Sequence, residues 1–130
     1  MTKNLTILAI DSTGHFSSAG IFDKIGNELF LTSYDCNFKE SNSELSSKSI
    51  SSLISGVINR SKKEKIDMIG ITLGPGSFTK IRSSLSFAKG LALGLKIPLI
   101  GVNSFQKLFY ATKLTFKKNV NLVLACDTFR

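Results

Sequence analysis

Short apolar stretches that are typical of strands fill the first third of the chain. Residues 4–10 form an apolar run, and 16–23 and 28–36 are further strand-like segments. Between the last two, residues 24–27 (Lys-Ile-Gly-Asn) carry turn residues. The pattern therefore predicts an antiparallel meander of three strands.

Beyond residue 40 the apolar positions change to helical spacing. Ser41 followed by Glu44 has the form of a capping box, which marks a helix start. The apolar positions that recur on one helical face are Ile50, Leu53, Ile54, Val57 and Ile58. We therefore predict a helix over 42–60.

Strands and helices alternate in the second half. In chain order we predict a buried strand over 66–73, a helix over 78–95, a short strand over 98–102, a helix over 104–114 and a last strand over 120–126. Gly74-Pro75-Gly76 ends the first of these strands, and Ser77 or Thr79 is the candidate N-cap of the next helix. The predicted order is βββαβαβα followed by a strand.

Length and composition bound the class of protein. With 130 residues, 42% of them hydrophobic, the chain can bury one self-sufficient core, so 1–130 is expected to be one domain. No apolar run reaches the roughly 18 residues that cross a bilayer, and the N-terminus has no basic signal region. We expect a cytoplasmic protein with no membrane partner. Cys36 and Cys126 show no metal-ligand spacing and are expected to be reduced thiols.

The formal net charge is +8 and the isoelectric point about 9.7. Such a charge suits a polyanionic partner. However, the basic residues are dispersed, and no aromatic side chains are interleaved with them as in a base-stacking platform. A solvated basic surface is therefore the alternative.

Two segments have the residue types of a phosphate site. Asp11, Ser12 and Thr13 end the first strand with a carboxylate and hydroxyls, which can hold a phosphate or a metal-bound water, but which also make an ordinary turn. The second segment joins a buried strand to a helix and consists of Gly74, Pro75, Gly76, Ser77, Phe78 and Thr79. Its glycines allow close backbone approach and the helix start offers N–H groups to an anion, although a tight turn without ligand is the alternative. It is not a Walker A sequence, because Thr79 precedes Lys80.

Carboxylates suited to metal catalysis are few. A ribonuclease-H-type nuclease needs several carboxylates at strand ends, yet the strand ending at Thr72-Leu73 supplies none. Asp127 is the only other acid at a comparable strand end, and the single histidine, His15, has no second imidazole beside it in the sequence. We therefore predict neither a metal site nor a catalytic residue.

Four segments occur in the order and spacing of one family: Ile7-Leu8-Ala9-Ile10-Asp11-Ser12-Thr13, Gly74-Pro75-Gly76-Ser77-Phe78-Thr79-Lys80-Ile81-Arg82, Ala88-Lys89-Gly90-Leu91-Ala92 and Ile97-Pro98-Leu99-Ile100-Gly101-Val102-Asn103-Ser104. In these the chain resembles the TsaB family, of the Gcp-like group of actin-like ATPases. The resemblance implies an actin-like, ribonuclease-H-like α/β lobe: a mixed five-stranded sheet with helices on both faces. It also implies a non-catalytic protein that pairs with TsaD, which transfers threonylcarbamoyl to adenosine in transfer RNA, with a small ATPase, TsaE, joining them.

The chain departs from the family pattern at Asn42, where a histidine is common, at Gly14, which replaces a hydroxyl residue, and at Lys80, which replaces a glycine. It also lacks the pair of metal-binding histidines that a catalytic TsaD-like subunit places on a helix, which favours the TsaB side. By resemblance, 1–118 is an N-terminal lobe and 119–130 the start of a truncated second lobe. Since nucleotides of this superfamily bind between two lobes, we expect no cofactor here and ATP only through partner subunits.

The helix over 78–95 has a candidate partner surface. Besides a core face and a polar stripe, it carries a third, apolar or small face, formed by Ser84, Phe87, Leu91 and Gly94. The helix over 42–60 would cover this face within the lobe; alternatively a TsaD-like subunit or a second copy of the chain covers it.

The leading hypothesis is an accessory subunit without catalytic activity of its own, with transfer RNA reached through the complex. The alternative is a nucleotide-binding or phosphotransfer fragment of the actin-like and sugar-kinase superfamily, using Asp11 and the loop 74–79.

Overall fold

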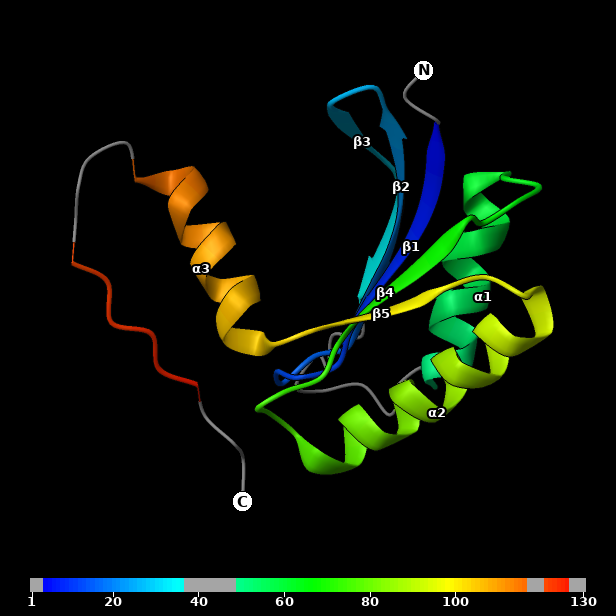
Figure 1. Cartoon of the computed structure of the whole chain (residues 1–130). Coiled ribbons are helices and arrows are strands. Elements are labelled where there is room, and N and C mark those ends of the chain that lie inside the picture. The colour runs from blue at the N-terminus through cyan, green and yellow to red at the C-terminus, as the bar shows by residue number, and fades with distance from the viewer. Residues whose placement is uncertain (1–3, 37–48, 117–120, 127–130) are drawn as a thin grey trace, which may run out of the picture.

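The computed structural model describes residues 4–36, 49–116 and 121–126 (Figure 1). Its strands are β1 (Leu5–Asp11), β2 (Ser18–Ile25), β3 (Glu28–Cys36), β4 (Met68–Thr72) and β5 (Leu99–Val102), and its helices are α1 (Ile50–Ser61), α2 (Phe78–Leu95) and α3 (Ser104–Thr115). This order, βββαβαβα, is the predicted one. Among the described residues, no helix has the length and apolarity that crossing a membrane would need.

The strands form one mixed sheet in the order β3-β2-β1-β4-β5. The first three strands pair antiparallel, as the meander predicted, and β4 and β5 continue the sheet parallel to β1. Each parallel strand needs a helical crossover to return the chain to the same edge, which α1 and α2 provide. The carboxyl ends of β1, β4 and β5 therefore meet at one edge of the sheet.

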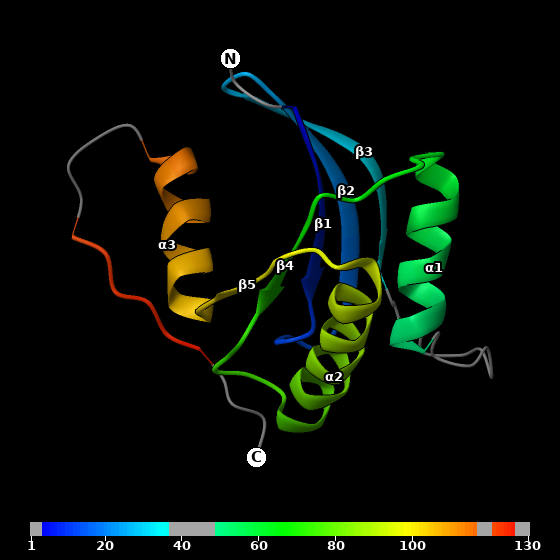
Figure 2. The ribbon, with the colours of Figure 1, turned by 45° about the vertical axis from the view of Figure 1, so that its right-hand side comes forward.

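Helices cover both faces of the sheet, as predicted. Figure 2 shows α1 and α2 side by side on one face and α3 on the other. The core lies between the sheet and the first two helices, because strand alternation points Leu8 and Ile10 of β1 to that face. The register pairs Leu8 with Ile69 and Ile10 with Ile71, so β4 adds its apolar side chains to the same layer. Leu53 and Val57 of α1 close the core, all of these side chains being at most 3% exposed.

Helix α1 starts later than the sequence indicated. Ser49 is its N-cap, with extended backbone (φ −60°, ψ 154°), and its Oγ accepts a hydrogen bond from Ser52 N at 3.2 Å. A helix running without a break over 42–60 is therefore wrong, because Ser49 leaves the helical conformation and uses its side chain as a cap. The predicted capping box of Ser41 and Glu44, and Asn42, lie outside the described residues.

The last predicted strand is wrong over the residues that are described. Residues 121–126 have no strand conformation, and the side chain of Val123 is 93% exposed. A strand needs a neighbouring strand to satisfy its backbone groups, and an apolar run by itself cannot supply one. Residues 117–120 and 127–130, including Asp127, lie outside the described part of the chain. A second lobe beginning at 119 stays a prediction.

Candidate functional site

Asp11 is the last residue of β1 and lies at the edge where the parallel strands end. Its Oδ1 accepts hydrogen bonds from Thr13 N at 3.0 Å, Thr13 Oγ1 at 2.7 Å and Thr72 Oγ1 at 2.6 Å. The bonds to Thr13 make a tight local turn, as its polar residues suggested. Thr72 comes from the end of β4, which pairs with β1 through Ile10 and Ile71.

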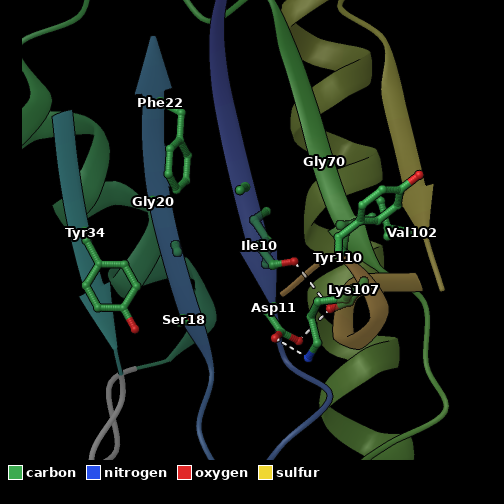
Figure 3. A pocket seen from close by; sticks show the side chains of 14 residues that line it. Ile10, Asp11, Ser18, Gly20, Phe22, Tyr34, Gly70, Val102, Lys107 and Tyr110 are labelled. Carbon is green, nitrogen blue, oxygen red and sulfur yellow. Dashed lines mark hydrogen bonds and ion pairs between the residues drawn. The ribbon is translucent and has the colours of Figure 1, made fainter. Parts of the chain in front are cut away.

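Lys107 is the residue at this site that the sequence reasoning missed. Its Nζ lies 2.7 Å from Asp11 Oδ2 and 3.1 Å from Thr13 Oγ1 (Figure 3). Lys107 stands in the first turn of α3, where Asn103 and Gln106 form a capping box. One signal was present: α3 follows β5, and a strand parallel to β1 brings the start of its helix to the same sheet edge as Asp11.

These contacts fix the charge of Asp11. Burial raises the pKa of its carboxyl, but hydrogen bonds from Lys107, Thr72 and Thr13 lower it further, to about 2. The carboxylate is therefore ionised at neutral pH. Three of the four donors bind Oδ1 and one, Lys107, binds Oδ2, so Oδ1 is fully used as an acceptor while Oδ2 keeps one lone-pair site. Asp11 is thus the acceptor of a network in which its charge is paired with Lys107.

The two predicted phosphate-binding segments lie against each other. Ser77 N donates a hydrogen bond to Thr13 O at 3.0 Å. A Cβ at Gly76 would stand 2.3 Å from that same oxygen, so only glycine allows the two backbones to approach this closely. The lack of a side chain at Gly76 therefore lets this loop pack against the backbone of Thr13, and not against a ligand. This geometry favours the structural turn over a phosphate-binding loop.

The neighbours of this contact also have protein partners. Gly74 has a φ of +103°, and its carbonyl accepts a hydrogen bond from Ser104 N at 2.8 Å, which ties the loop to the start of α3. Ser77 occupies the N-cap of α2 without a side-chain cap bond. Phe78 is 68% exposed, with the guanidinium of Arg82 4.5 Å from its ring centre. The remaining members of the predicted set differ in burial: Ser12 is buried, Pro75 is half-buried and Thr79 is exposed.

Histidine and cysteine do not add a metal site to this edge. The described residues contain no group of at least three His, Cys, Asp or Glu side chains that could hold a metal ion. His15 lies in the loop between β1 and β2, and its carbonyl accepts a hydrogen bond from Lys80 Nζ. Cys36 and Cys126 are free thiols.

The predicted partner face of α2 is only partly open. Ser84 is 1% exposed and lies in a buried line with Ala88 and Ala92, so it is covered within the chain, which was one of the two alternatives for this face. Residues four apart lie on one side of a helix, and in α2 this side faces the sheet. The side of α2 that faces the core is therefore rotated from the predicted one. Phe87 and Leu91 are half-buried against the core. Gly94 is exposed.

A cavity of about 380 Å³ lies on the face of the sheet that carries α3, with Asp11 and Lys107 at one end (Figure 3). Its walls include Phe22, Tyr34 and Tyr110. Its lining does not include the loop 74–77, and the sequence pattern did not indicate it, because the lining comes from five strands and a helix.

Comparison with known proteins places the chain in a family. A family model described as "TsaD: tRNA N6-adenosine threonylcarbamoyltransferase" matches residues 40–128. The chain is 34% identical over 115 residues to a tRNA N6-adenosine threonylcarbamoyltransferase of Porphyromonas gingivalis, which covers 79% of this chain and 33% of the relative. It is 30% identical over 128 residues to the protein of that name in Clostridium kluyveri, covering 90% of this chain and 38% of the relative. The chain thus spans little more than a third of the length of these relatives.

Among solved structures, YeaZ from Pseudomonas aeruginosa has a similar fold, with a TM-score of 0.58 at 21% identity, over 76% of this chain and 44% of the YeaZ chain. The fold class expected from the sequence is thereby confirmed. The family model carries the TsaD name and the sequence relatives are named threonylcarbamoyltransferases, whereas the structural neighbour is a YeaZ protein. The predicted Gcp-like group is therefore confirmed, and membership of its TsaB branch stays a prediction. Because the family model matches well over half of its residues, this chain belongs to the TsaD family of tRNA N6-adenosine threonylcarbamoyltransferases.

Proposed function

We propose that the chain is an accessory, non-catalytic protein in the formation of N6-threonylcarbamoyladenosine in transfer RNA, and that it pairs with a TsaD-like catalytic subunit. The observation that carries this proposal is the ion pair between Lys107 and Asp11, at 2.7 Å. This ion pair neutralises the charge of the carboxylate that ends β1.

The pairing of the carboxylate supports an accessory role. A carboxylate that takes part in metal or phosphate chemistry uses its charge on that ligand, whereas the charge of Asp11 is paired with Lys107 and its Oδ1 accepts hydrogen bonds from Thr72 and Thr13. The family resemblance implies that a catalytic TsaD-like subunit has two metal-binding histidines on a helix. This chain has one histidine, His15, between two strands.

The comparisons support the pathway and the branch separately. The relatives by sequence are named as threonylcarbamoyltransferases, which supports a role in this modification. The similarity of fold to YeaZ, a TsaB protein, supports the accessory branch. In this proposal the TsaE-like ATPase and transfer RNA are reached through the complex, and ATP is bound by the partner subunits.

Reconstitution tests the proposal. The full chain, a TsaD-like subunit and a TsaE-like ATPase are combined with transfer RNA, threonine, bicarbonate and ATP in the presence of the enzyme that makes the threonylcarbamoyl donor. Modified nucleoside is measured by mass spectrometry. We expect no product from the chain without the TsaD-like subunit, and more product when the chain is added to the other components than when it is left out.

The Asp11→Asn variant tests whether Asp11 takes part in the reaction. It keeps the shape of the side chain and removes its charge, so we expect product formation within about threefold of the unsubstituted chain. A loss of several orders of magnitude, with assembly intact by size-exclusion chromatography, would contradict the proposal and place the reaction on this chain.

A further inference from the structure

The floor of the cavity beside α3 is made of residues with little or no side chain. The strand register pairs Ala9 with Gly20 of β2 and with Gly70 of β4, so the three residues form one row across the sheet. A Cβ at Gly70 would meet no atom within 4 Å, which means that the space above it is open. At Gly20 the ring of Phe22 lies over the backbone, 3.0 Å from where a Cβ would be. The floor is therefore flat over Ala9 and Gly70 and ends at Phe22.

Aromatic side chains stand on both sides of this floor. Tyr34 rises from β3 on one side, and Tyr110 of α3 lies on the other, near Val102 of β5 (Figure 3). Tyr34 and Tyr110 are 55% and 64% exposed, so solvent reaches the cavity. A volume of about 380 Å³ lies within the range of about 300–1,000 Å³ that small-molecule pockets occupy. The flat floor and the aromatic walls favour a ligand that has a planar apolar group.

The polar end of the cavity selects for an anionic oxygen. A lysine ammonium has three N–H donors, and Lys107 uses its contacts to Asp11 Oδ2 and Thr13 Oγ1, which leaves one donor. The charge of Asp11 is already paired with Lys107 at 2.7 Å, so a ligand cation would have to compete with that ammonium. The hydroxyl of Tyr34 points to the same end (Figure 3), and burial together with the neighbouring Cys36 raises the pKa of this hydroxyl, so it carries no negative charge that would repel an anion.

We propose that this cavity binds a small aromatic carboxylic acid, with the ring on the floor of Ala9 and Gly70 and the carboxylate on Lys107. A phosphate dianion fits less well, because phosphate sites use several backbone N–H groups or cations, and this end has one ammonium with one donor left. The inference goes beyond the accessory role and does not depend on it.

Binding of 2-naphthoate to the full chain tests this inference, with 2-naphthamide as the uncharged ligand of the same shape. Both affinities are measured by isothermal titration calorimetry at pH 7. We expect the acid to bind at least about tenfold more tightly than the amide, because only the acid pairs with Lys107. Lys107→Arg should keep this preference and Lys107→Met should remove it.

Gly70→Val fills the floor and should weaken both ligands at least about tenfold. Gly90→Ala is the matched control, since Gly90 lies on α2, across the sheet from the cavity, and its Cβ would also meet no atom within 4 Å. Should Gly70→Val fail to fold, Tyr110→Ala replaces it, because a side chain 64% exposed can be removed without opening the core. Equal affinity for acid and amide, undiminished binding in the variant that fills the floor or removes the wall, or no binding of the acid, would overturn the proposal.

Discussion

At the scale of the residue, the carboxylate of Asp11 accepts hydrogen bonds from three residues of the same chain, Thr13, Thr72 and Lys107. The network joins the end of β1 to β4 and to α3, through Thr72 and Lys107. Since the folded-state pKa of Asp11 is about 2, lowered from 3.8, its contribution to stability is fully present above about pH 4. It is lost as the pH falls from about 4 to about 2, because the carboxylate then takes up a proton and its ion pair with Lys107 is broken.

Asp11→Asn should therefore lower the free energy of unfolding at pH 7 by about 1–2 kcal/mol, a value reduced for the partial exposure of the pair. The difference from the unsubstituted chain should shrink as the pH falls from 4 to 2. Urea unfolding at a series of pH values measures it. A difference that stays constant over this range would mean that the charge of Asp11 is not what stabilises the fold.

Gly76 is the second residue whose role only its neighbours reveal. In Gly76→Val the new Cβ would lie 2.3 Å from Thr13 O and 2.7 Å from Thr13 Cβ, so the two loops would have to separate. We expect a loss of about 1–3 kcal/mol in the free energy of unfolding, measured in urea without ligand. Gly14→Ala is the control, because its Cβ meets nothing within 4 Å, and it should change stability by less than about 0.5 kcal/mol. Equal stability of the two variants would contradict the close approach.

At the scale of the element, α2 has a buried line that packs on the sheet and an exposed apolar C-terminal end. Its buried line of Ser84, Ala88 and Ala92 serves the sheet, while Leu93 and Leu95, on either side of Gly94, are 81% and 47% exposed. The proposed interface with a TsaD-like subunit, or with a second copy, is therefore expected at the C-terminal half of α2. The half-buried Phe87 and Leu91 serve the core first.

Gly94→Glu tests whether the C-terminal half of α2 binds a partner, without disturbing the part of α2 that packs on the core. Its Cβ would meet no atom within 4 Å, so the chain should stay folded, whereas a carboxylate buried at an interface should weaken binding to the partner at least about tenfold. Analytical ultracentrifugation of the chain alone and with the TsaD-like subunit measures this. Ser86→Glu is the control, because Ser86 is an exposed residue of the polar stripe predicted on this helix, and this variant should bind as before.

Phe87→Glu should instead lower the stability of the monomer, since Phe87 packs against the core. If Gly94→Glu associates as tightly as the unsubstituted chain, this half of α2 is not the interface.

At the scale of the whole molecule, contacts within the chain occupy several of the polar groups at the sheet edge where a nucleotide would be expected. The N–H of Ser77 is used by Thr13, Gly76 packs on the same residue, and Asp11 is paired with Lys107. A helix N-terminus binds phosphate through free N–H groups, and the first of these is taken. We expect the isolated chain to bind ATP with a Kd weaker than about 1 mM, by equilibrium dialysis with labelled ATP. A Kd below about 0.1 mM would favour the phosphotransfer alternative.

The sequence alone determined the order of the strands and helices up to α3, because each signal for them is local. The strand-like composition of 28–36, the helical spacing over 78–95 and the Gly74-Pro75-Gly76 break are properties of neighbouring residues, and β3 and α2 have these same bounds in the structure. The start of α1 was missed, since Ser41 and Ser49 both precede serine-rich helical sequence, and the cap that forms depends on where the helix packs against β2 and β3.

Tertiary structure alone decided the partners of each polar group. Asp11 and Lys107 are 96 residues apart, and only the parallel arrangement of β1, β4 and β5 brings the start of α3 to the carboxylate. The glycine row of the cavity is likewise invisible in the sequence, because Ala9, Gly20 and Gly70 become neighbours only through strand register. The sequence determines which side chains are present, but whether a carboxylate has an ion-pair partner depends on which elements the fold brings together.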